Sequence, residues 1–401
     1  MEEYKMDTFG LSILKGIISF FLHPLTYITI IGAFMLGLSR VKRDRRDFHT
    51  RVHDVLDDVP FAIIPGLLMG AAFLILNLLL GLTIPFSTTV AMSLGAFLLL
   101  VTGQIRFLSP AFVFILPTLA TFFYTPIDFG NDTLNTMQEG IGNASPIALA
   151  ILVGFLVFME GLFITMNAGK QTSPRLVESK RGKLVGAHEV QRLWLLPLFL
   201  FLPVGQVESF TWWPLLDFGA GTYAFILLPF PIGFRKLIHH ALPLPEMKSN
   251  GRQVALLGGA TVLIGLMSYF LSNKWIALVA IILVILGRAG ILLLHRGKNK
   301  PAYFNERNKG LVILGILPGS PADQMNLQVG EVISKVNGLP LGKGVDFYTA
   351  LQRNAAFCKM EVLDVNGEVR FEQKALYNNT HHELGLLFVK ENRFEEQEEA
   401  Q

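Results

Sequence analysis

The sequence contains few charged residues and almost no cysteine. Asp, Glu, Lys and Arg make up 16% of the 401 residues, whereas hydrophobic residues make up 51%. A soluble globular domain is about one quarter charged, so the composition excludes a wholly soluble chain and indicates a membrane protein with a soluble part. The single cysteine, Cys358, excludes an intramolecular disulfide framework and suits a reducing compartment such as the cytosol.

Sequence motifs of catalysis are also missing. A zinc metalloprotease helix needs two His four residues apart around a Glu, but His188 and His382 are each followed by Glu without a second His. His49 and His53 have the spacing of two metal ligands but no third ligand beside them, so we interpret them as part of a solvated helical face. Neither a Gly-x-Ser-x-Gly elbow nor a Gly-x-x-x-x-Gly-Lys-Ser/Thr phosphate loop occurs. We therefore predict no enzyme, no metal and no cofactor.

Long apolar runs fill the first 300 residues, and a membrane-crossing helix needs about 20 such residues. We predict a polytopic α-helical membrane domain over 1–300 with about eight to nine spans. The lower number applies if the first run lies in the interface. The predicted spans are Leu11–Leu38, Phe61–Leu82, Val90–Thr102, Phe107–Tyr124, Ile147–Met166, Leu193–Val207, Trp213–Phe234, Val254–Leu271 and Trp275–Leu294.

Basic residues are concentrated in alternate connections between these runs. The segments 40–58 and 170–192 each carry six Lys or Arg and 235–252 carries four, whereas Pro126–Pro146 carries none. Because positively charged loops stay on the cytoplasmic side, we expect the three basic segments and the C-terminal region in the cytoplasm, and Pro126–Pro146 outside. Such a cluster at 40–58 could bind nucleic acid or anionic lipid head groups. We favour membrane anchoring with lipid contact and predict no nucleic acid.

A few polar residues interrupt the apolar runs. An ionisable residue at membrane depth, such as Glu160, is a functional candidate, but its position near the basic end of its run favours a structural role. Arg288 is expected to extend toward the cytoplasmic head groups, and His23 to cap a proline kink. With Asn77 and Gln104, Glu160 could line a transport path, although no duplicated halves are found.

The segment Lys309–Gly338 has a dense pattern of strand and turn residues. The branched apolar run Leu311–Leu317 leads into the turn Pro318–Ala322 and a short helix, and a second strand, Glu331–Val336, ends at the hairpin-type turn Asn337-Gly338. This order resembles a bacterial PDZ domain. The resemblance implies a small β-sandwich or barrel with two helices that binds an extended peptide along a sheet edge and carries no chemistry.

We expect this domain over 301–390, followed by an acidic disordered tail over 391–401. Its Gly-containing peptide-binding loop, Glu383–Leu386, comes after the core strands, so the strand order resembles the permuted order of many bacterial PDZ domains. The groove would lie between the last strand, Leu384–Val389, and the helix Val345–Asn354, although that strand could also be a simple sheet edge. A bulky residue at Gly385 should then abolish peptide binding but not folding. The predicted groove residues are Leu384, Gly385, Leu386, Phe347, Tyr348 and Leu351.

The whole chain is similar to the MinJ family of division-site determinants of Gram-positive rods. The similarity rests on the order of domains, on the segment FFLHPLTYITIIGAFMLGLSRVKRDRRDFHTRVHD at 20–54 and on the terminal PDZ-like domain. It implies a non-enzymatic membrane adaptor at septum and poles. Such an adaptor would bridge a DivIVA-like scaffold to MinD, and through it MinC, so that assembly of the FtsZ ring is restricted. The alternatives are a PDZ-regulated transporter or exporter subunit, which Glu160→Gln should inactivate, and a substrate-presenting partner of a membrane protease.

Overall fold

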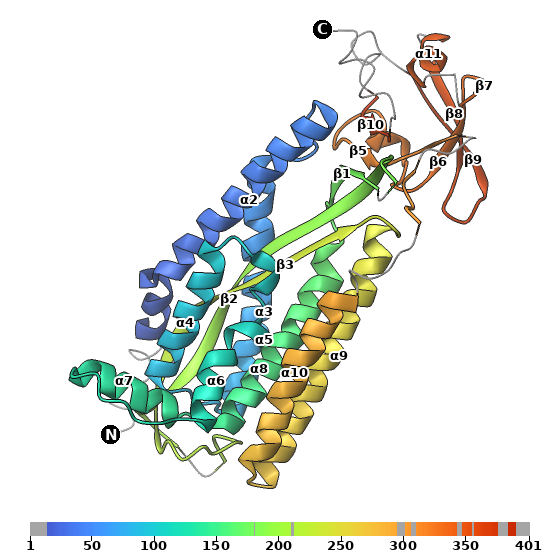
Figure 1. Cartoon of the computed structure of the whole chain (residues 1–401). Helices are drawn as coiled ribbons and strands as arrows, with labels where there is room; N and C mark the ends of the chain where they lie inside the picture. Colours follow the sequence, from blue (N-terminus) through green and yellow to red (C-terminus); the bar gives the residue numbers. More distant parts are fainter. Residues whose placement is uncertain are drawn as a thin grey trace.

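A computed structural model describes residues 14–179, 181–209, 212–294, 301–305, 310–342, 347–354, 357–375 and 384–389. Within these residues, five helical segments are long and apolar enough to cross a membrane, which agrees with the predicted membrane protein. They run roughly side by side in Figure 1. The segments are α2 (Pro24–Phe48), α3 (Asp58–Leu80) with the preceding turn η1 (Val55–Asp57), α8 (Pro146–Phe163) with its π-helical extension η3 (Ile164–Ala168), α9 (Pro243–Phe270) and α10 (Lys274–Leu294).

The first predicted span, Leu11–Leu38, is divided at His23, so its long helix begins later than predicted, at Pro24, and also ends later. His23 is its N-cap and accepts a hydrogen bond from the Leu25 amide at 3.2 Å, while Pro24 occupies the first helical position. The predicted role of His23 as a cap at a proline is therefore confirmed. The helix continues through the basic segment to Phe48, where His49 adopts a left-handed conformation with φ 56°.

The predicted count of eight to nine helical spans is wrong. The third predicted span is the 16-residue helix α4 (Phe86–Val101), and the fourth is broken into η2 (Ile105–Phe107), α5 (Pro110–Val113) and α6 (Ile115–Phe122). The sixth and seventh are the strands β2 (Leu184–Glu208) and β3 (Thr222–Ile238) of a long antiparallel hairpin. The remaining elements here are α7 (Asp132–Gly142), within the predicted outside loop, and β1 (Ser173–Glu178), which pairs with β2.

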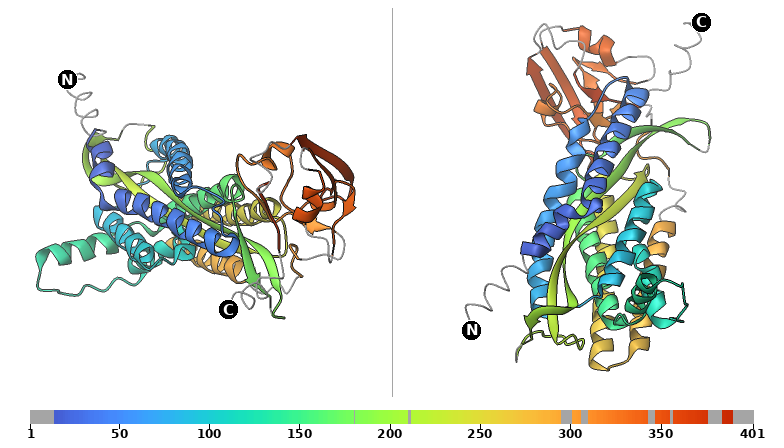
Figure 2. Two further views of the ribbon diagram at one scale, coloured as in Figure 1. Left: turned by 90° about the horizontal axis from the view of Figure 1, so that it is seen from above. Right: turned by 90° about the vertical axis from the view of Figure 1, so that its left-hand side faces the viewer.

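The hairpin passes between α2 and α3 on one side and α8, α9 and α10 on the other (Figures 1 and 2). Backbone groups of a strand in an apolar environment must find partners inside the protein. Neighbouring helices and connections supply some of these partners. The Asn77 side-chain amide donates to the Phe199 carbonyl at 2.8 Å, the Ile84 amide donates to the Phe201 carbonyl at 2.8 Å, and the Gly233 amide donates to the Leu108 carbonyl at 2.7 Å. Asn77 thus anchors the hairpin and does not line a transport path.

Glycines allow two close contacts in the membrane part. A Cβ at Gly66 of α3 would lie 1.9 Å from the Leu195 carbonyl oxygen of β2, so α3 packs directly on the hairpin backbone. A Cβ at Gly258 of α9 would lie 2.2 Å from the Phe158 amide of α8, and small residues let helix backbones approach in this way. The hairpin is therefore an integral layer of the bundle.

The C-terminal part is rich in β structure and lies beyond the ends of the helices (Figure 1). One sheet has the order β4-β6-β8-β9 with β7 paired to β6, and β10 pairs with β5 in a second sheet. The predicted turn Asn337-Gly338 is confirmed, because both residues have positive φ (49° and 83°). The elements are β4 (Leu311–Val312), β5 (Gly315–Ile316), η4 (Asp323–Met325), β6 (Val332–Val336), β7 (Leu339–Pro340), α11 (Phe347–Gln352), β8 (Phe357–Leu363), β9 (Val369–Ala375) and β10 (Leu386–Leu387).

Candidate functional site

The predicted groove residues come together at β10 and α11. Phe347 and Leu351 of α11 and Leu384 and Leu386 around β10 belong to one buried apolar cluster, and Tyr348 packs against it half-buried. The Phe347 ring lies 5.0 Å from the Phe388 ring. Four of the six predicted residues therefore contribute to the core between the strand and the helix. Glu383 and Val345, the first residues of the predicted loop and helix, lie outside the described residues, as does the tail 391–401.

Gly385 has a structural role that the sequence did not reveal. Its φ is +82°, and a Cβ built on it would lie 2.2 Å from the Ser320 Cβ. Its carbonyl accepts a hydrogen bond from the Leu317 amide at 2.8 Å. Any side chain here would meet both steric conflict and backbone strain. The expectation that a bulky residue at Gly385 spares folding is therefore wrong.

One edge of β10 has no strand partner in the described part of the chain. Leu386 and Leu387 pair with Ile316 and Gly315 of β5, and no second described strand pairs with β10. An unpaired strand edge presents backbone N–H and C=O groups that an extended peptide can pair with. Leu384, Leu386 and Leu387 are each at most 9% exposed, so peptide addition beside α11 stays a prediction.

The C-terminal part is docked on the base of the hairpin. The Gly186 amide of β2 donates to the Phe304 carbonyl at 2.7 Å, and the Tyr303 amide donates to the His239 carbonyl at 2.8 Å. A Cβ at Gly186 would lie 2.6 Å from Leu314 and 2.8 Å from the Phe304 Cβ, so only glycine permits this approach. An apolar cluster seals the contact, formed by Phe304, Val312, Leu314, Val332 and Val389 with Phe48, Leu176 and Leu242 packed against it.

His188 lies at this contact. Its side chain is 2% exposed, its ring centroid lies 5.0 Å from that of Phe304, and its Nδ1 is 2.8 Å from the Thr172 Oγ1. Burial lowers the pKa of His188 to about 4. The imidazole is therefore neutral at physiological pH, and protonation would place an unpaired charge in the contact.

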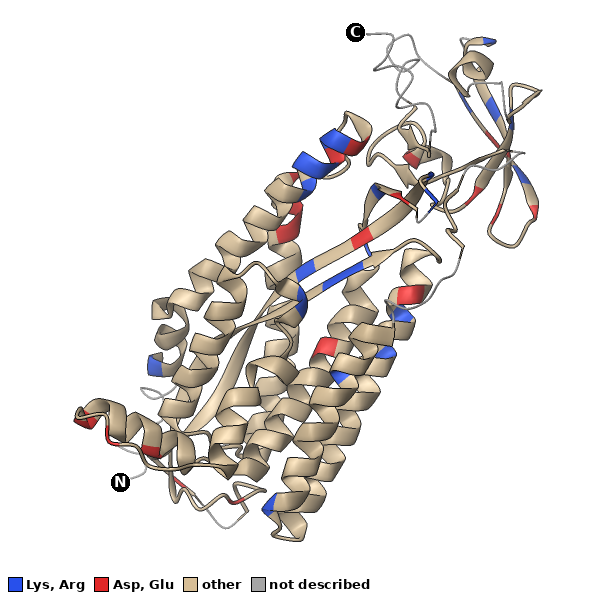
Figure 3. Cartoon of the chain, in the orientation of Figure 1, with Lys and Arg blue, Asp and Glu red and all other residues tan. Residues whose placement is uncertain are grey.

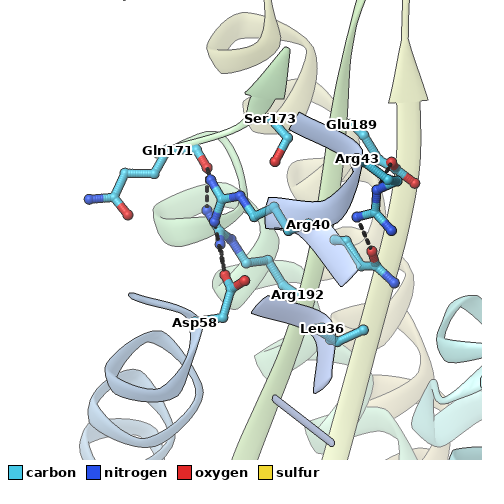
Figure 4. Close-up of a pocket in the computed structure, with 9 residues that line it drawn as sticks. Leu36, Arg40, Arg43, Asp58, Gln171, Ser173, Glu189 and Arg192 are labelled. Atoms are coloured by element: carbon cyan, nitrogen blue, oxygen red, sulfur yellow. Dashed lines mark hydrogen bonds and ion pairs between the residues drawn. The ribbon is translucent and has the colours of Figure 1, made fainter. Parts of the chain in front are cut away.

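A buried network of charges lies beside the docked part (Figure 4). Arg40 of α2 and Arg192 of β2 both donate to Asp58 Oδ1, at 3.1 and 2.8 Å. Arg40 and Arg192 also donate to the Gln171 carbonyl, and each is 4% exposed. Buried charges persist only when paired and hydrogen-bonded in this way. The space among these side chains, about 10 Å³, holds at most one water, so the network is a structural joint between α2, α3 and the hairpin.

A second carboxylate extends this network. Glu189 of β2 pairs with Arg43 at 3.4 Å, with Arg235 at 2.8 Å and also with Arg175. Asp47 pairs with Arg175 at 2.9 Å. Arg40 and Arg43 of the basic cluster thus face inward, whereas Lys42, Arg45 and Arg46 are exposed. Anchoring by lipid contact is left to the exposed members of the cluster.

His53 joins this region and does not join His49. Burial, and then the charges of Arg40 and Arg192, lower the pKa of His53 to about 3. His53 is buried in the connection before α3, while His49 is exposed at the end of α2, so the shared helical face predicted for them is wrong. Among the described residues no group of three or more His, Cys, Asp or Glu is placed to hold a metal ion.

Glu160 is fully buried and paired. Its Oε1 accepts from Arg288 Nη2 at 2.6 Å and from Arg288 Nε at 3.1 Å, and its Oε2 accepts from the Ser109 hydroxyl at 2.6 Å. Arg288 is 1% exposed, so the prediction that it extends toward the head groups is wrong. The pair ties α8 to α10 and to the start of α5, which agrees with the structural role favoured for Glu160.

Lys and Arg gather at the end of the helices on which the C-terminal part docks, which we call the basic end (Figure 3). The opposite end carries the connection before α8, with Asp128, Asp132 and Glu139. This distribution has the asymmetry that the positive-inside rule describes.

Comparison with known proteins identifies full-length relatives. The chain is 36% identical over 390 residues, 96% of its length and 97% of the relative's, to cell division topological determinant MinJ of Bacillus subtilis (strain 168). It is 23% identical over 362 residues, 88% of its length and 92% of the relative's, to probable cell division topological determinant MinJ of Lacticaseibacillus paracasei. A protein of the same name from Lacticaseibacillus casei (strain BD-II) matches equally. No family model and no solved structure matches the chain.

Proposed function

Because the chain belongs to the MinJ family of cell division topological determinants, we propose that it is a membrane adaptor in division-site selection. In this role it bridges a DivIVA-like scaffold at the septum and poles to MinD, and through it MinC, so that FtsZ ring assembly is restricted. The observation that carries the proposal is the similarity to MinJ over 96% of the chain, which includes both the membrane part and the C-terminal part.

We assign the C-terminal part to the cytoplasm as a PDZ domain of permuted order. Its support is the sequence of strands and turns over 311–338, the hairpin turn at Asn337-Gly338 and the edge of β10 that has no described strand partner. A partner peptide would add as a strand to β10, with Tyr348 on the helix side of the groove. Leu384, Gly385, Leu386, Phe347 and Leu351 hold the strand and helix at the spacing that the peptide needs.

The docking on the hairpin suits an adaptor. Two backbone hydrogen bonds and an apolar cluster fix the C-terminal part against the membrane part, so it stays close to the bilayer surface. A domain held there meets membrane-bound partners at a raised effective concentration. Two of the three polar residues that could have lined a transport path have structural partners instead, since Glu160 pairs with Arg288 and Asn77 binds the hairpin. These contacts favour the adaptor over a transporter.

Co-purification tests the proposed partners. The tagged full-length chain, solubilised from cells in mild detergent, is expected to retain both the DivIVA-like scaffold and MinD. Tyr348→Ala should reduce capture of the partner whose peptide occupies the groove by about tenfold, the loss of one aromatic contact worth roughly 1 kcal/mol or more.

Phe371→Ala provides the matched control, because Phe371 is 63% exposed on β9, away from β10 and α11. Capture of neither partner by the wild-type chain would contradict the bridging role. Equal capture by wild type and Tyr348→Ala would contradict the groove only.

A further inference from the structure

A cavity of about 620 Å³ lies at the basic end of the membrane part. It is bounded by the turn between α4 and α5, by all three strands β1, β2 and β3, and by α9 and α10. Ligand pockets in proteins commonly have volumes of roughly 300 to 1,000 Å³. The cavity is therefore large enough for a small ligand, in contrast to the space within the Arg40–Asp58 network. Its polar lining residues are Gln104, Arg106, Arg175, Glu189, Arg235, Lys236, His239, Asn250 and Arg288.

Positive charge dominates this lining. Five cationic side chains face a single lining carboxylate, that of Glu189. Four of the five have carboxylate partners: Arg175 and Arg235 share Glu189, Lys236 pairs with Glu246, and Arg288 pairs with Glu160. Within the described residues, Arg106 has no carboxylate within ion-pair distance, so the cavity has an uncompensated cation.

Three residues that line the cavity each carry one buried side-chain atom without a hydrogen-bond partner among the described residues. These atoms are Arg106 Nε, Arg288 Nη1 and Asn250 Oδ1. Arg288 is 1% exposed and Asn250 is 3% exposed, so water reaches these side chains poorly. A buried polar group left unpaired costs about 1 to 3 kcal/mol. Because these three atoms are hidden from solvent, a ligand in the cavity would not contact them directly. The half-buried Arg106 side chain is the uncompensated cation that a ligand can reach.

The rest of the wall is apolar. Ile105, Phe234, Leu237, Ile291 and Leu292 line the cavity beside the cations. Leu237 is 45% exposed, and α10 carries exposed Leu293 and Leu294 directly after Leu292. An anion that is wholly polar would gain nothing from these surfaces, whereas an amphiphile would bury its apolar part against them.

We propose that this cavity binds the headgroup of an anionic glycerophospholipid, such as phosphatidylglycerol, from the bilayer leaflet at the basic end. The phosphate would accept hydrogen bonds from the Arg106 guanidinium. The glycerol and first methylene groups would lie along Ile291 and Leu292. This site goes beyond the adaptor role and does not depend on any protein partner.

Lipid binding to the full-length chain tests the proposal. The protein, purified in detergent and stripped of lipid, is titrated with phosphatidylglycerol, phosphatidylcholine or inorganic phosphate, and native mass spectrometry measures the bound fraction. Phosphatidylglycerol is expected to bind at least tenfold more tightly than phosphatidylcholine. Arg106→Gln should reduce phosphatidylglycerol binding severalfold.

Arg45→Gln is the matched control, because it removes one exposed positive charge from the same end of the molecule without touching the cavity. If Arg106→Gln and Arg45→Gln weaken phosphatidylglycerol binding equally, the binding is explained by general electrostatic attraction and the proposed site is overturned. Equal binding of phosphatidylglycerol and phosphatidylcholine would overturn the headgroup. If inorganic phosphate at the same concentration binds to the protein and prevents binding of the lipid, the ligand of the cavity is a soluble phosphate and the lipid proposal is overturned. None of these outcomes affects the proposed division role, because the binding experiment contains no protein partner.

Discussion

The carboxylate of Glu160 lies in an apolar bundle and is satisfied by Arg288 and Ser109. Such a pair adds little net stability, but loss of one partner leaves the other charge buried and unpaired. Glu160, Asn77 and His23 each interrupt an apolar run, and each has a definite structural partner. At this scale the sequence identified the important positions correctly. It could not supply their partners, because Arg288 lies 128 residues from Glu160 along the chain.

Removal of the Glu160 carboxylate alone should destabilise the protein. Glu160→Leu leaves Arg288 without its counter-charge, and we expect a loss of about 3 to 5 kcal/mol in unfolding free energy. The double variant Glu160→Leu, Arg288→Leu should recover most of it. Thermal unfolding in detergent measures the stability of the single and the double variant. Similar melting of the single and double variants would contradict the pair. Glu160→Gln should also reduce the amount of folded protein, so it does not separate a transporter from an adaptor.

The docking contact should weaken in acid because of His188. Its pKa is about 4 in the folded protein, below the ordinary value of 6.5, so the folded state binds the proton less well than the unfolded state. The stability that depends on neutral His188 is complete above pH 6.5 and is lost as the pH falls from 6.5 toward 4, by on the order of 1 kcal/mol per pH unit.

Thermal unfolding between pH 7.5 and 4.5 measures this loss. His188→Gln keeps a neutral side chain that can bond to Thr172, and its melting temperature should fall less steeply over this range. Parallel pH curves for the wild type and the variant would rule out His188 as the titrating group.

At the scale of elements, the β2–β3 hairpin is the feature that sequence reasoning missed. The run Leu193–Val207 has 15 residues, too short for a helix that crosses the membrane but ample for a strand, which rises about 3.3 Å per residue. Pro197 and Pro229 each interrupt an apolar run and lie opposite each other in the hairpin. These signals were visible, but the helix groups that satisfy the hairpin backbone come from residues such as Asn77, which are distant in sequence.

The contact between α3 and the hairpin should depend on Gly66. Gly66→Ala places a methyl group close to the Leu195 carbonyl oxygen. As for an overpacked core, we expect the unfolding free energy to fall by about 1 to 3 kcal/mol. Gly290→Ala in α10 is the matched control, since a Cβ there meets no atom within 4 Å. Detergent melting temperatures compare the two, and a control as unstable as Gly66→Ala would show that helix composition, not the hairpin contact, sets the effect.

For the whole molecule, the hairpin links the membrane part to the C-terminal part. β2 has 25 residues and spans roughly 80 Å, well beyond the ~30 Å hydrocarbon core, so its base reaches the docked part. The turn Asn337-Gly338 and the strand before it were predicted closely, since turn residues are local signals. The predicted strand Leu311–Leu317 instead forms two short strands, β4 and β5, which belong to different sheets. The docking was not predicted, because the contact of Gly186 with Phe304 and Leu314 depends on tertiary structure.

Fluorescence imaging of the tagged full-length protein in a dividing rod-shaped host, with and without its DivIVA-like scaffold, tests the adaptor role most directly. The account predicts bands at midcell and signal at the poles that disperse when the scaffold is absent. It also predicts elongated cells or misplaced septa when the chain is deleted. A uniform membrane signal that is indifferent to the scaffold, with normal division in the deletion strain, would contradict it.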